Sequence, residues 1–336
     1  MSPIVPVFRA RDVEAAVPPE LAVDAVRDAF VAHFHGGWTM PPKVYVTNYP
    51  AGDFRAMPAL GGGHALLKWV TSFPGNPALG LPTVSGLVLL SDAGTGELKA
   101  VFDAGAVTAL RTGAAAVLAA ETLGRADAET AAVVGTGVNG RAAARTFVAR
   151  GRSVALWDVN LERARAAAEE LGASIAGSLE QALRADLVVT VTPGKEVLLP
   201  DAALASGQHV SLMGADGPGK AEIAPTELAR TRGFCDDREQ ANTNGIRDPE
   251  ALVRLFVDDW EQASHSGDTA RAVEAGLITR DDVTTLGAVL AGEAPGRISP
   301  DDITIFDSTG LAIQDLAIAL CCMERMADLH LMFVEL

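Results

Sequence analysis

The stretch AAVVGTGVNGRAAARTFVARG, Ala131–Gly151, joins an apolar, strand-like run to a glycine-containing turn and then to a helix-forming run. Its glycines, Gly135, Gly137 and Gly140, have the spacing GxGxxG. In this pattern the first glycine permits a tight turn, the second lets the backbone approach a pyrophosphate, and the third lets helix and strand pack closely. The phosphates lie at the helix N-terminus, where the helix dipole favours negative charge. The stretch therefore predicts a strand, turn and helix that bind a dinucleotide.

A second signal follows at Asp158, which ends the next strand-like run, SVALWD, 18 positions after Gly140. An acidic side chain there accepts hydrogen bonds from ribose hydroxyls and would repel the 2′-phosphate of NADP, so it favours NAD. Arg163 and Arg165 are expected on the solvated face of the following helix. The alternative, a glycine turn that binds nothing, does not account for the linked acidic residue.

From Thr130 onward, short apolar runs alternate with helix-forming runs. Such alternation predicts a parallel sheet with helices on both faces, entered by right-handed crossovers, which is the doubly wound Rossmann-type arrangement of the α/β class. The expected strands cover 130–135, 153–158, 174–177, 186–192, 208–214 and 232–237, and the expected helices cover 139–151, 161–172, 178–185, 202–207 and 224–231.

The first hundred residues have a different pattern, with one helix at 18–37 and strands separated by Gly, Pro and Asn. This pattern predicts a mostly antiparallel sheet. A long Ala-rich helix is expected at 103–125, helices again at 253–267 and 268–292, and a strand, a turn and a closing helix over 301–336. The expected strands of the first part cover 43–49, 54–60, 65–73, 83–92 and 97–103.

The composition of the chain restricts the kinds of molecule that the protein is expected to bind. With 336 residues, 49% hydrophobic and 21% charged, the chain resembles an ordinary globular protein of two domains. A formal charge of -16 argues against non-specific binding to nucleic acid or to anionic membranes and favours small-molecule partners. The first residues lack a charged region followed by an apolar core, and no apolar run reaches the roughly 18 to 20 residues that span a bilayer, so a cytoplasmic location is expected.

Two other classes of site are not supported. The cysteines, Cys235, Cys321 and Cys322, form no CxxC pair and have no histidine at metal-ligand spacing, so neither a zinc site nor a disulfide framework is expected. No GxSxG motif occurs, which argues against a serine hydrolase.

Several strings, taken together, resemble the ornithine cyclodeaminase and mu-crystallin family, which contains NAD-dependent alanine dehydrogenases of archaeal type and ketimine reductases. The resemblance runs from about Val44 to about Ala319. It implies a homodimer in which 1–115 and 305–336 form a substrate-binding and dimerisation domain and 116–304 form the inserted NAD-binding Rossmann domain. The strings are LLKWVTSFPGN, LPTVSGLVLLSDAGTGELKAVFDAGAVTALRTGAAA, VVGTGVNG, LMGADGPGKAEI, GEAPGRIS and ITIFDSTGLAIQD.

The resemblance also implies the roles of individual residues. Asp216, on the glycine-rich loop after the apolar run HVSLMG, matches the family's catalytic acid or base, and Lys68, the second expected catalytic residue, matches one of its active-site cations. The expected substrate-binding residues are Lys43, Arg55, Lys68, Arg111 and Thr309. The expected cofactor-binding residues are Thr83, Arg111, Thr112, Gly135, Gly137, Val138, Asn139, Gly140, Asp158, Thr192, Met213, Lys220 and Ser308.

These residue types suit the oxidation of an amino acid. The reaction needs a cation for the α-carboxylate, a group that exchanges protons with the amine or with water, and a nicotinamide. Arg111 has the planar fork that binds a carboxylate with two hydrogen bonds. Lys68 stands in an apolar strand beside Trp69, where burial is expected to lower its pKa.

Arg55 distinguishes between activities within the family. Cyclodeaminase members carry a Glu two residues before the MP of the first domain, and here DFRAMPAL places Arg55 at that position. A cation there would repel the distal ammonium of ornithine by about 1 to 4 kcal/mol at contact distance, and would suit a substrate with a second anionic or neutral polar end. The leading expectation is therefore an NAD-dependent amino-acid dehydrogenase or imine reductase. The alternatives are an ornithine or lysine cyclodeaminase and a non-catalytic, nucleotide-bound protein of mu-crystallin type.

Overall fold

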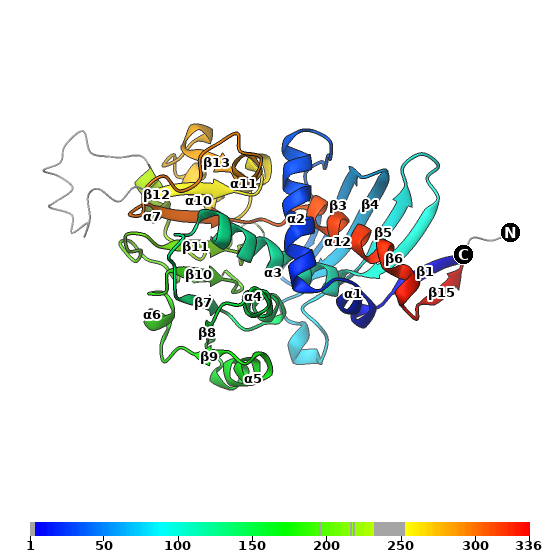
Figure 1. Cartoon of the computed structure of the whole chain (residues 1–336), viewed down its shortest axis with the longest axis horizontal. Coiled ribbons are helices and arrows are strands. Elements are labelled where there is room, and N and C mark those ends of the chain that lie inside the picture. The colour runs from blue at the N-terminus through cyan, green and yellow to red at the C-terminus, as the bar shows by residue number, and fades with distance from the viewer. Residues whose placement is uncertain (1–3, 195, 216, 218, 232–252) are drawn as a thin grey trace, which may run out of the picture. The chain divides into compact units, whose positions relative to one another are not determined.

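The computed structural model describes residues 4–194, 196–215, 217, 219–231 and 253–336 (Figure 1). The chain forms two compact units, Met1–Arg111 with Leu311–Leu336, and Thr112–Gly310. Helix α3 (Ala104–Leu123) carries the chain from the first unit into the second. The strand expected at 232–237 and the catalytic residue expected at Asp216 lie outside the described residues.

The second unit contains an eight-stranded sheet in which every hydrogen-bonded pair of strands is parallel. Its order is β13-β12-β14-β11-β10-β7-β8-β9, so the chain winds outward in both directions from β7. The central strands are buried on both faces, which explains why they read as continuous apolar runs. The predicted α/β, Rossmann-type fold is confirmed. The strands are β7 (Ala131–Val134), β8 (Val154–Trp157), β9 (Ser174–Ile175), β10 (Leu187–Thr190), β11 (His209–Leu212), β12 (Val253–Val257), β13 (Val283–Thr285) and β14 (Ile303–Asp307).

Capping residues in the sequence account for both ends of helix α5 (Leu161–Leu171) in this unit. The Asn160 side chain accepts a hydrogen bond from the backbone of Arg163 and caps α5, and Gly172, with a φ of 66°, ends that helix. The helices are α4 (Val138–Ala149), α5 (Leu161–Leu171), α6 (Leu179–Ala182), α7 (Pro225–Leu228), α9 (Trp260–Ala263), α10 (Asp268–Glu274) and α11 (Leu286–Leu290).

Three expectations for this unit are wrong. The segment 268–292, predicted as helices, contains the strand β13, which pairs with β12. Residues 202–207, predicted as a helix, form turns, because Ala202 and Gly207 both adopt positive φ and break helical geometry. The segment 253–267, predicted as a helix, begins with β12, since the branched and aromatic side chains of Val253–Val257 suit a strand that pairs with both β13 and β14.

The expected domain break between 304 and 305 falls inside β14. This strand pairs with β11 on one side and β12 on the other, so it cannot be divided between two units. The structure moves the break to the end of the turn that follows, between Gly310 and Leu311.

The first unit contains a seven-stranded sheet of order β15-β1-β6-β5-β4-β3-β2. Neighbouring strands are antiparallel except β1 and β6, as the pattern of short strands and turns predicts. The edge pair β1 and β15 was not expected, because 332–335 was assigned to the closing helix. The strands are β1 (Ile4–Phe8), β2 (Val44–Asn48), β3 (Gly52–Gly61), β4 (His64–Ser72), β5 (Val84–Asp92), β6 (Leu98–Asp103) and β15 (Met332–Glu335).

Helices cover one face of this sheet. The helices α2 (Pro19–Phe34) and α12 (Ala312–Glu324) pack against each other, and α12 also packs on β3, β4 and β5 (Figure 1). The short helix α1 (Ala10–Ala16) lies beside them. In the register of the central strands, Met57, Lys68 and Val88 are neighbours and all three are buried, so Lys68 lies on the face that the helices cover.

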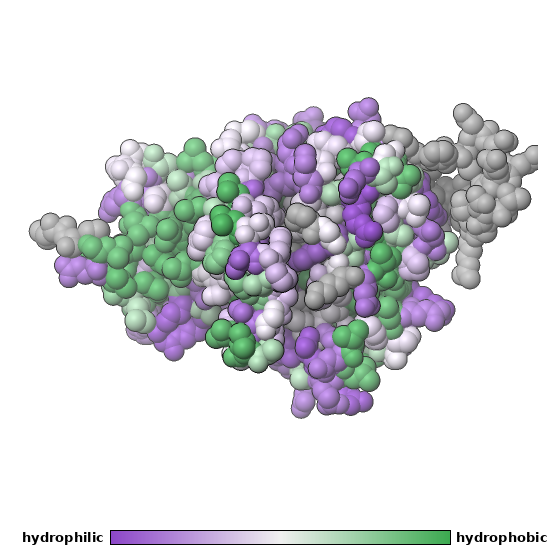
Figure 2. All heavy atoms as spheres, turned by 180° about the vertical axis from the view of Figure 1, so that it is seen from behind, coloured by the Kyte–Doolittle hydropathy of each residue, from purple (hydrophilic) through white to green (hydrophobic). Residues whose placement is uncertain are grey.

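The opposite face of the sheet exposes apolar side chains. We call Val44, Val46, Leu67, Trp69 and Leu87 the apolar sheet face; each is at least 39% exposed. Figure 2, which views this side, shows hydrophobic residues gathered over a broad area of the first unit. A continuous exposed patch of this kind marks an interaction surface.

The glycines of the GxGxxG motif differ in how closely other atoms surround them, and this difference leads to a testable prediction. A Cβ on Gly140 would lie 1.8 Å from the Gly135 carbonyl oxygen, whereas a Cβ on Gly137 would meet no atom within 4 Å. We expect Gly140→Ala to destabilise the protein by about 1 to 3 kcal/mol through overpacking. Gly137→Ala, at a φ of -67° that alanine accepts, is the matched control and should unfold at the wild-type temperature. Thermal unfolding followed by circular dichroism measures both; equal losses would contradict this account of the packing.

Candidate active site

Several of the residues predicted to contact the nucleotide lie along one edge of the parallel sheet. Val134, Trp157, Thr190, Leu212 and Asp307 are neighbours in the register of five adjacent strands, and each is the last residue of its strand. Because the strands are parallel, the residues that follow them meet at the same edge, where open α/β sheets bind their ligands. These following residues include Gly135, Asp158, Thr192, Met213 and Ser308.

The glycine turn presents backbone to open space. Gly135 has a φ of 97°, and a Cβ there would lie 2.7 Å from the Val191 carbonyl oxygen. Gly137 is exposed and precedes the first residue of α4, with Val138 71% exposed and Asn139 half-buried after it. The turn therefore places exposed backbone at the N-terminus of a three-turn helix, an arrangement that suits a pyrophosphate.

Asp158 is held at the end of β8. Its Oδ2 accepts hydrogen bonds from the Thr136 backbone N–H at 2.8 Å and the Thr136 hydroxyl at 2.9 Å, and its Oδ1 accepts one from the Asn160 N–H at 2.8 Å. Burial alone would raise the pKa of Asp158, but these hydrogen bonds outweigh it and lower the pKa, so the carboxylate is ionised at neutral pH.

The two arginines expected on the solvated face of α5 differ. Arg165 is exposed and forms an ion pair with Glu162. Arg163 is half-exposed, but its Nη1 lies 3.7 Å from the Asp158 Oδ2. Arg163 therefore contributes positive charge beside Asp158, which the sequence had not indicated.

Glu222, to which the sequence assigned no role, ties two strand ends together. Its carboxylate accepts hydrogen bonds from the Thr190 hydroxyl at 2.7 Å, from the Thr192 N–H at 2.8 Å and hydroxyl at 2.6 Å, and from the Gly214 N–H at 2.9 Å. Burial raises the pKa of Glu222 despite these bonds. The close packing requires glycine at 214, where a Cβ would lie 2.3 Å from the Thr192 carbonyl oxygen.

Asp258 fixes the turn after β14. It accepts hydrogen bonds from the Ser308 hydroxyl at 3.1 Å, the Thr309 hydroxyl at 3.1 Å and the Gly310 N–H at 2.7 Å. Ser308 and Thr309, expected to contact cofactor and substrate, are thus buried with their hydroxyls bonded to Asp258. The sequence did not reveal this acid, because the strand that it follows had been assigned to a helix.

Two further carboxylates are buried side by side in the same unit. Asp268 accepts from the backbone N–H groups of Glu222 at 2.6 Å and Ile223 at 3.0 Å, and Asp307 accepts from that of Thr269 at 2.7 Å. Burial raises both pKa values; the charge of Asp307 adds to the rise at Asp268, and the charge of Asp258 adds to the rise at Asp307, whose pKa reaches about 7. The pair therefore retains a proton at neutral pH and connects the 214–223 loop to β14.

The first unit contains a buried cluster of cations. The Lys68 Nζ lies 2.9 Å from the Asp315 Oδ1, with the lysine 1% exposed, and the Arg111 Nε lies 3.6 Å from the same oxygen. Burial lowers the pKa of Lys68 to about 8, opposed by Asp315 and reinforced by the positive charges of Arg111 and Arg55. The lowered pKa is the one expected from the apolar strand, and it lets Lys68 exchange a proton near neutral pH.

Asp315, like Glu222, was not assigned a role from the sequence. A signal was present, because an aspartate in the first turn of the otherwise apolar helix α12 has to be buried, and a buried carboxylate requires a partner. What the sequence did not show was that this partner stands 247 positions earlier, at Lys68.

Arg55 also has a carboxylate partner. Its Nε lies 2.6 Å from the Asp53 Oδ1 and its Nη2 lies 3.3 Å from the Oδ2, with both side chains buried. The Tyr49 hydroxyl donates to the same Oδ2 at 3.3 Å, and the Tyr45 ring lies 5.4 Å from the guanidinium. The positive charge expected from Arg55 is therefore balanced by Asp53.

Two buried polar atoms of the cation cluster have no hydrogen-bond partner among the described residues, the Arg111 Nε and the Asp315 Oδ2. Buried donors and acceptors are rarely left unsatisfied, so an N–H of this kind beside a lysine is a site where a ligand carboxylate fits.

The other predicted residues lie as follows. Lys43 directly precedes β2 and is half-buried, and Thr83 precedes β5, where its carbonyl accepts a hydrogen bond from the Phe73 N–H at 2.8 Å. Thr112 is buried on α3, and its hydroxyl has no hydrogen-bond partner in the described part of the chain. Met213 is buried after β11, and Lys220 is half-buried in the loop beyond it.

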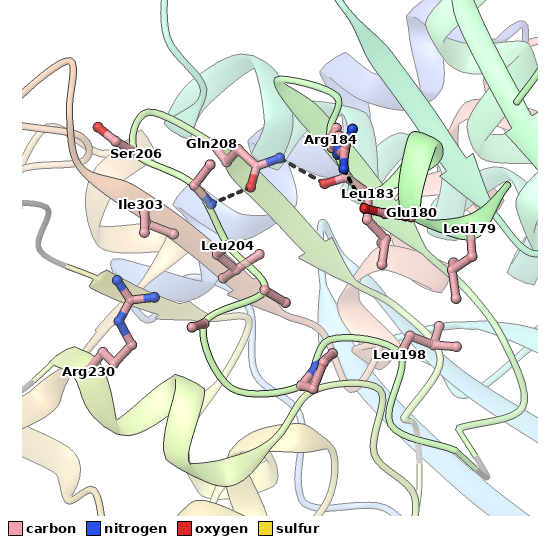
Figure 3. Close-up of a pocket in the computed structure, with 14 residues that line it drawn as sticks. Leu179, Glu180, Leu183, Arg184, Leu198, Leu204, Ser206, Gln208, Arg230 and Ile303 are labelled. Carbon is pink, nitrogen blue, oxygen red and sulfur yellow. Dashed lines mark hydrogen bonds and ion pairs between the residues drawn. The ribbon is translucent and has the colours of Figure 1, made fainter. Parts of the chain in front are cut away.

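A pocket elsewhere in the second unit holds none of these residues (Figure 3). Leu179, Leu183, Leu198, Leu204 and Ile303 give it an apolar lining. Figure 3 shows Gln208 bonded to the chain beside it, donating to the Leu183 carbonyl at 2.9 Å and accepting from the Ala205 N–H at 2.7 Å. Ile303 begins β14, whereas the candidate site follows its last residue.

Comparison with known proteins identifies the family. The model of the ornithine cyclodeaminase/mu-crystallin family matches residues 6–329. The chain belongs to this family. It is 38% identical over 322 residues to the alanine dehydrogenase of Archaeoglobus fulgidus, covering 93% of this chain and 92% of that protein. The resemblance that the sequence motifs indicated is thereby confirmed.

Solved structures agree over the whole chain. An archaeal alanine dehydrogenase dimer with bound NAD superposes with a TM-score of 0.87 and 36% identity, covering 99% of both chains. The iminosuccinate reductase of Paracoccus denitrificans in complex with NAD+ gives a TM-score of 0.84 and 27% identity, covering 99% of this chain and all of that one.

The Asp268 and Asp307 pair makes the stability of the protein depend on pH. Because the pKa of Asp307 in the folded protein, about 7, exceeds the ordinary value of 3.8, its contribution to stability is present at low pH and is lost as pH rises through 7. Asp307→Asn should therefore gain stability over wild type as pH rises from 5 to 8, by up to about 1.4 kcal/mol per pH unit. Urea unfolding at several pH values measures the difference. A difference that stays constant with pH would show that the pair carries no extra proton.

Proposed function

We propose that this protein is an NAD-dependent oxidoreductase that interconverts a small α-amino acid with its imino or 2-oxo acid. The observation that carries the proposal is the buried cluster of Lys68, Arg111 and Asp315, with its unpartnered Arg111 N–H. A cation with a vacant hydrogen-bond position suits an α-carboxylate, and a lysine with a pKa of about 8 suits proton transfer beside it.

The cofactor proposal rests on the second unit. Gly137 leaves open the volume that a Cβ would fill, and the N-terminus of α4 and the ionised Asp158 fit a pyrophosphate and a ribose. Structures of two relatives contain NAD, in agreement with this fit. Gly135, Gly137, Val138, Asn139, Gly140 and Asp158 would hold the dinucleotide. The family resemblance supports Thr83, Arg111, Thr112, Thr192, Met213, Lys220 and Ser308 as further cofactor-binding candidates. When bound, NAD accepts the hydride from the substrate α-carbon.

Residues of the chain itself would bind the substrate carboxylate, polarise the reacting group and exchange protons with it. Arg111 orients the substrate by its carboxylate, and Lys68 polarises the carbonyl or imine. Lys43, Arg55 and Thr309 are further substrate-binding candidates from the family resemblance. Asp216, which lies outside the described residues, is proposed from the family resemblance to exchange protons with the amine or with attacking water. The overall reaction balances as amino acid, NAD+ and water giving 2-oxo acid, ammonium, NADH and a proton.

Assembly and location complete the proposal. The apolar sheet face suits a second copy of the chain, since a related archaeal enzyme is described as a dimer. The first unit would then bind substrate and dimerise, and the second would bind NAD.

We also propose a cytoplasmic location. Among the described residues, α3 alone has the length and apolar composition of a membrane span, and most of it is buried as a core helix.

An assay of NADH absorbance tests the function. Small amino acids with NAD+, and 2-oxo acids with ammonium and NADH, should give turnover, and NADPH should serve poorly. Ammonia release from ornithine or lysine without net NADH would instead indicate a cyclodeaminase. Retention of bound nucleotide without turnover of any substrate would indicate a binding protein, and a preference for NADPH would overturn the role of Asp158.

Asp315 makes a further prediction about the pH dependence of turnover. The negative charge of Asp315 raises the pKa of Lys68, so Asp315→Asn should lower it from about 8. The limb of the kcat/KM profile that reports Lys68 should move to lower pH, by about one unit or more for a buried partner. Asp328→Asn, an exposed position in the same unit, is the control. A uniform loss of rate at every pH would mean that Asp315 acts through the fold alone.

A further inference from the structure

The pair of Asp53 and Arg55 bears on which acids the site accepts. Both carboxylate oxygens of Asp53 face the guanidinium, one at 2.6 Å from Nε and one at 3.3 Å from Nη2. This is the paired geometry that Arg55 would otherwise offer to a carboxylate of the substrate. Arg55 is 7% exposed and Asp53 is 4% exposed, so the pair lies in the interior of the first unit.

The charges of the cluster indicate how many carboxylates fit. Lys68, Arg111 and Arg55 are cations, and Asp315 and Asp53 are anions, which leaves one positive charge in excess. One substrate carboxylate neutralises it, whereas a second would place an uncompensated anion in a buried site, which is costly.

The side chains beside Lys68 on the adjacent strands are apolar. Its register neighbours on the adjacent strands, Met57 and Val88, are 4% and 0% exposed and present hydrocarbon on the face that Lys68 shares. Neither offers a hydrogen bond to a distal polar group. A small uncharged side chain is the substrate group that such neighbours accommodate.

We infer that the substrate is a monocarboxylic amino or imino acid with a small uncharged side chain. Asp53 determines this specificity because its ion pair with Arg55 keeps Arg55 from binding a second substrate carboxylate. The inference rests on the proposed function and names its substrate class. It also decides between the two substrate types that the sequence left open at Arg55, an anionic and a neutral polar end. Removal of the Asp53 charge would expose Arg55 to a second carboxylate.

Reductive amination tests the inference, with pyruvate and oxaloacetate as the mono- and dicarboxylic probes. Wild-type protein should prefer pyruvate in kcat/KM by roughly 100-fold, since juxtaposed like charges are strongly disfavoured. Asp53→Asn should reduce this preference by about tenfold or more through a lower KM for oxaloacetate. The double variant Asp53→Asn with Arg55→Gln, which removes both charges of the pair, should lose that gain. Asp24→Asn, on an exposed position of α2, should keep the wild-type preference.

Inhibition of the wild type provides a measurement that does not depend on a variant folding. Propionate should compete with pyruvate more strongly than succinate does. A wild-type preference for oxaloacetate, an equal preference in Asp53→Asn and wild type, or stronger inhibition by succinate would overturn the inference while leaving the proposed function intact. If neither probe supports NADH oxidation, the proposed function itself fails.

Discussion

The buried ion pair between Lys68 and Asp315 is the interaction on which the organisation of the chain depends. An ammonium group at 1% exposure is tolerated only with a carboxylate beside it, and here that carboxylate comes from α12, 247 positions later. The last helix must therefore return to the sheet that the first hundred residues build. The whole of Thr112–Gly310 is inserted between the two partners. The same pair sets the pKa of Lys68, so one contact serves both the fold and the chemistry proposed for it.

Carboxylates perform a comparable role in the second unit, but through backbone N–H groups and hydroxyls rather than through cations. Glu222, Asp258 and Asp268 each accept hydrogen bonds from strand ends or from the loops that follow them. Such acceptors suit a sheet edge, where the backbone leaves the ladder and its N–H groups need partners. These acidic side chains therefore hold the strand ends in place through hydrogen bonds, while Gly137 and Val138 remain exposed.

The sequence was sufficient for the features that local patterning encodes. The GxGxxG turn, the acid after the second strand and the alternation of strands with helices determine the Rossmann-type unit, and short runs separated by Gly and Pro determine the antiparallel sheet. Elements that depend on distant partners were not predictable. The strand β12 reads as part of a helix until β13 and β14 lie beside it, and β15 reads as part of α12 until β1 pairs with it. The same applies to side chains: Lys68 and Arg111 stand out in the sequence, whereas Asp53, Asp315 and Glu222 acquire their roles only through burial and contact.

The pairing of β1 with β15 has a consequence for the order in which the protein is made. One unit is contiguous, Thr112–Gly310, and all of its described strands are synthesised before the residues that close the other unit. The sheet of the first unit lacks its edge strand β15, and Lys68 lacks its counter-ion, until the segment Leu311–Leu336 is made. Domains that are contiguous in sequence fold as units during synthesis. The inserted unit is thus the first to be complete, and the surrounding unit becomes complete only after Leu311–Leu336 are synthesised.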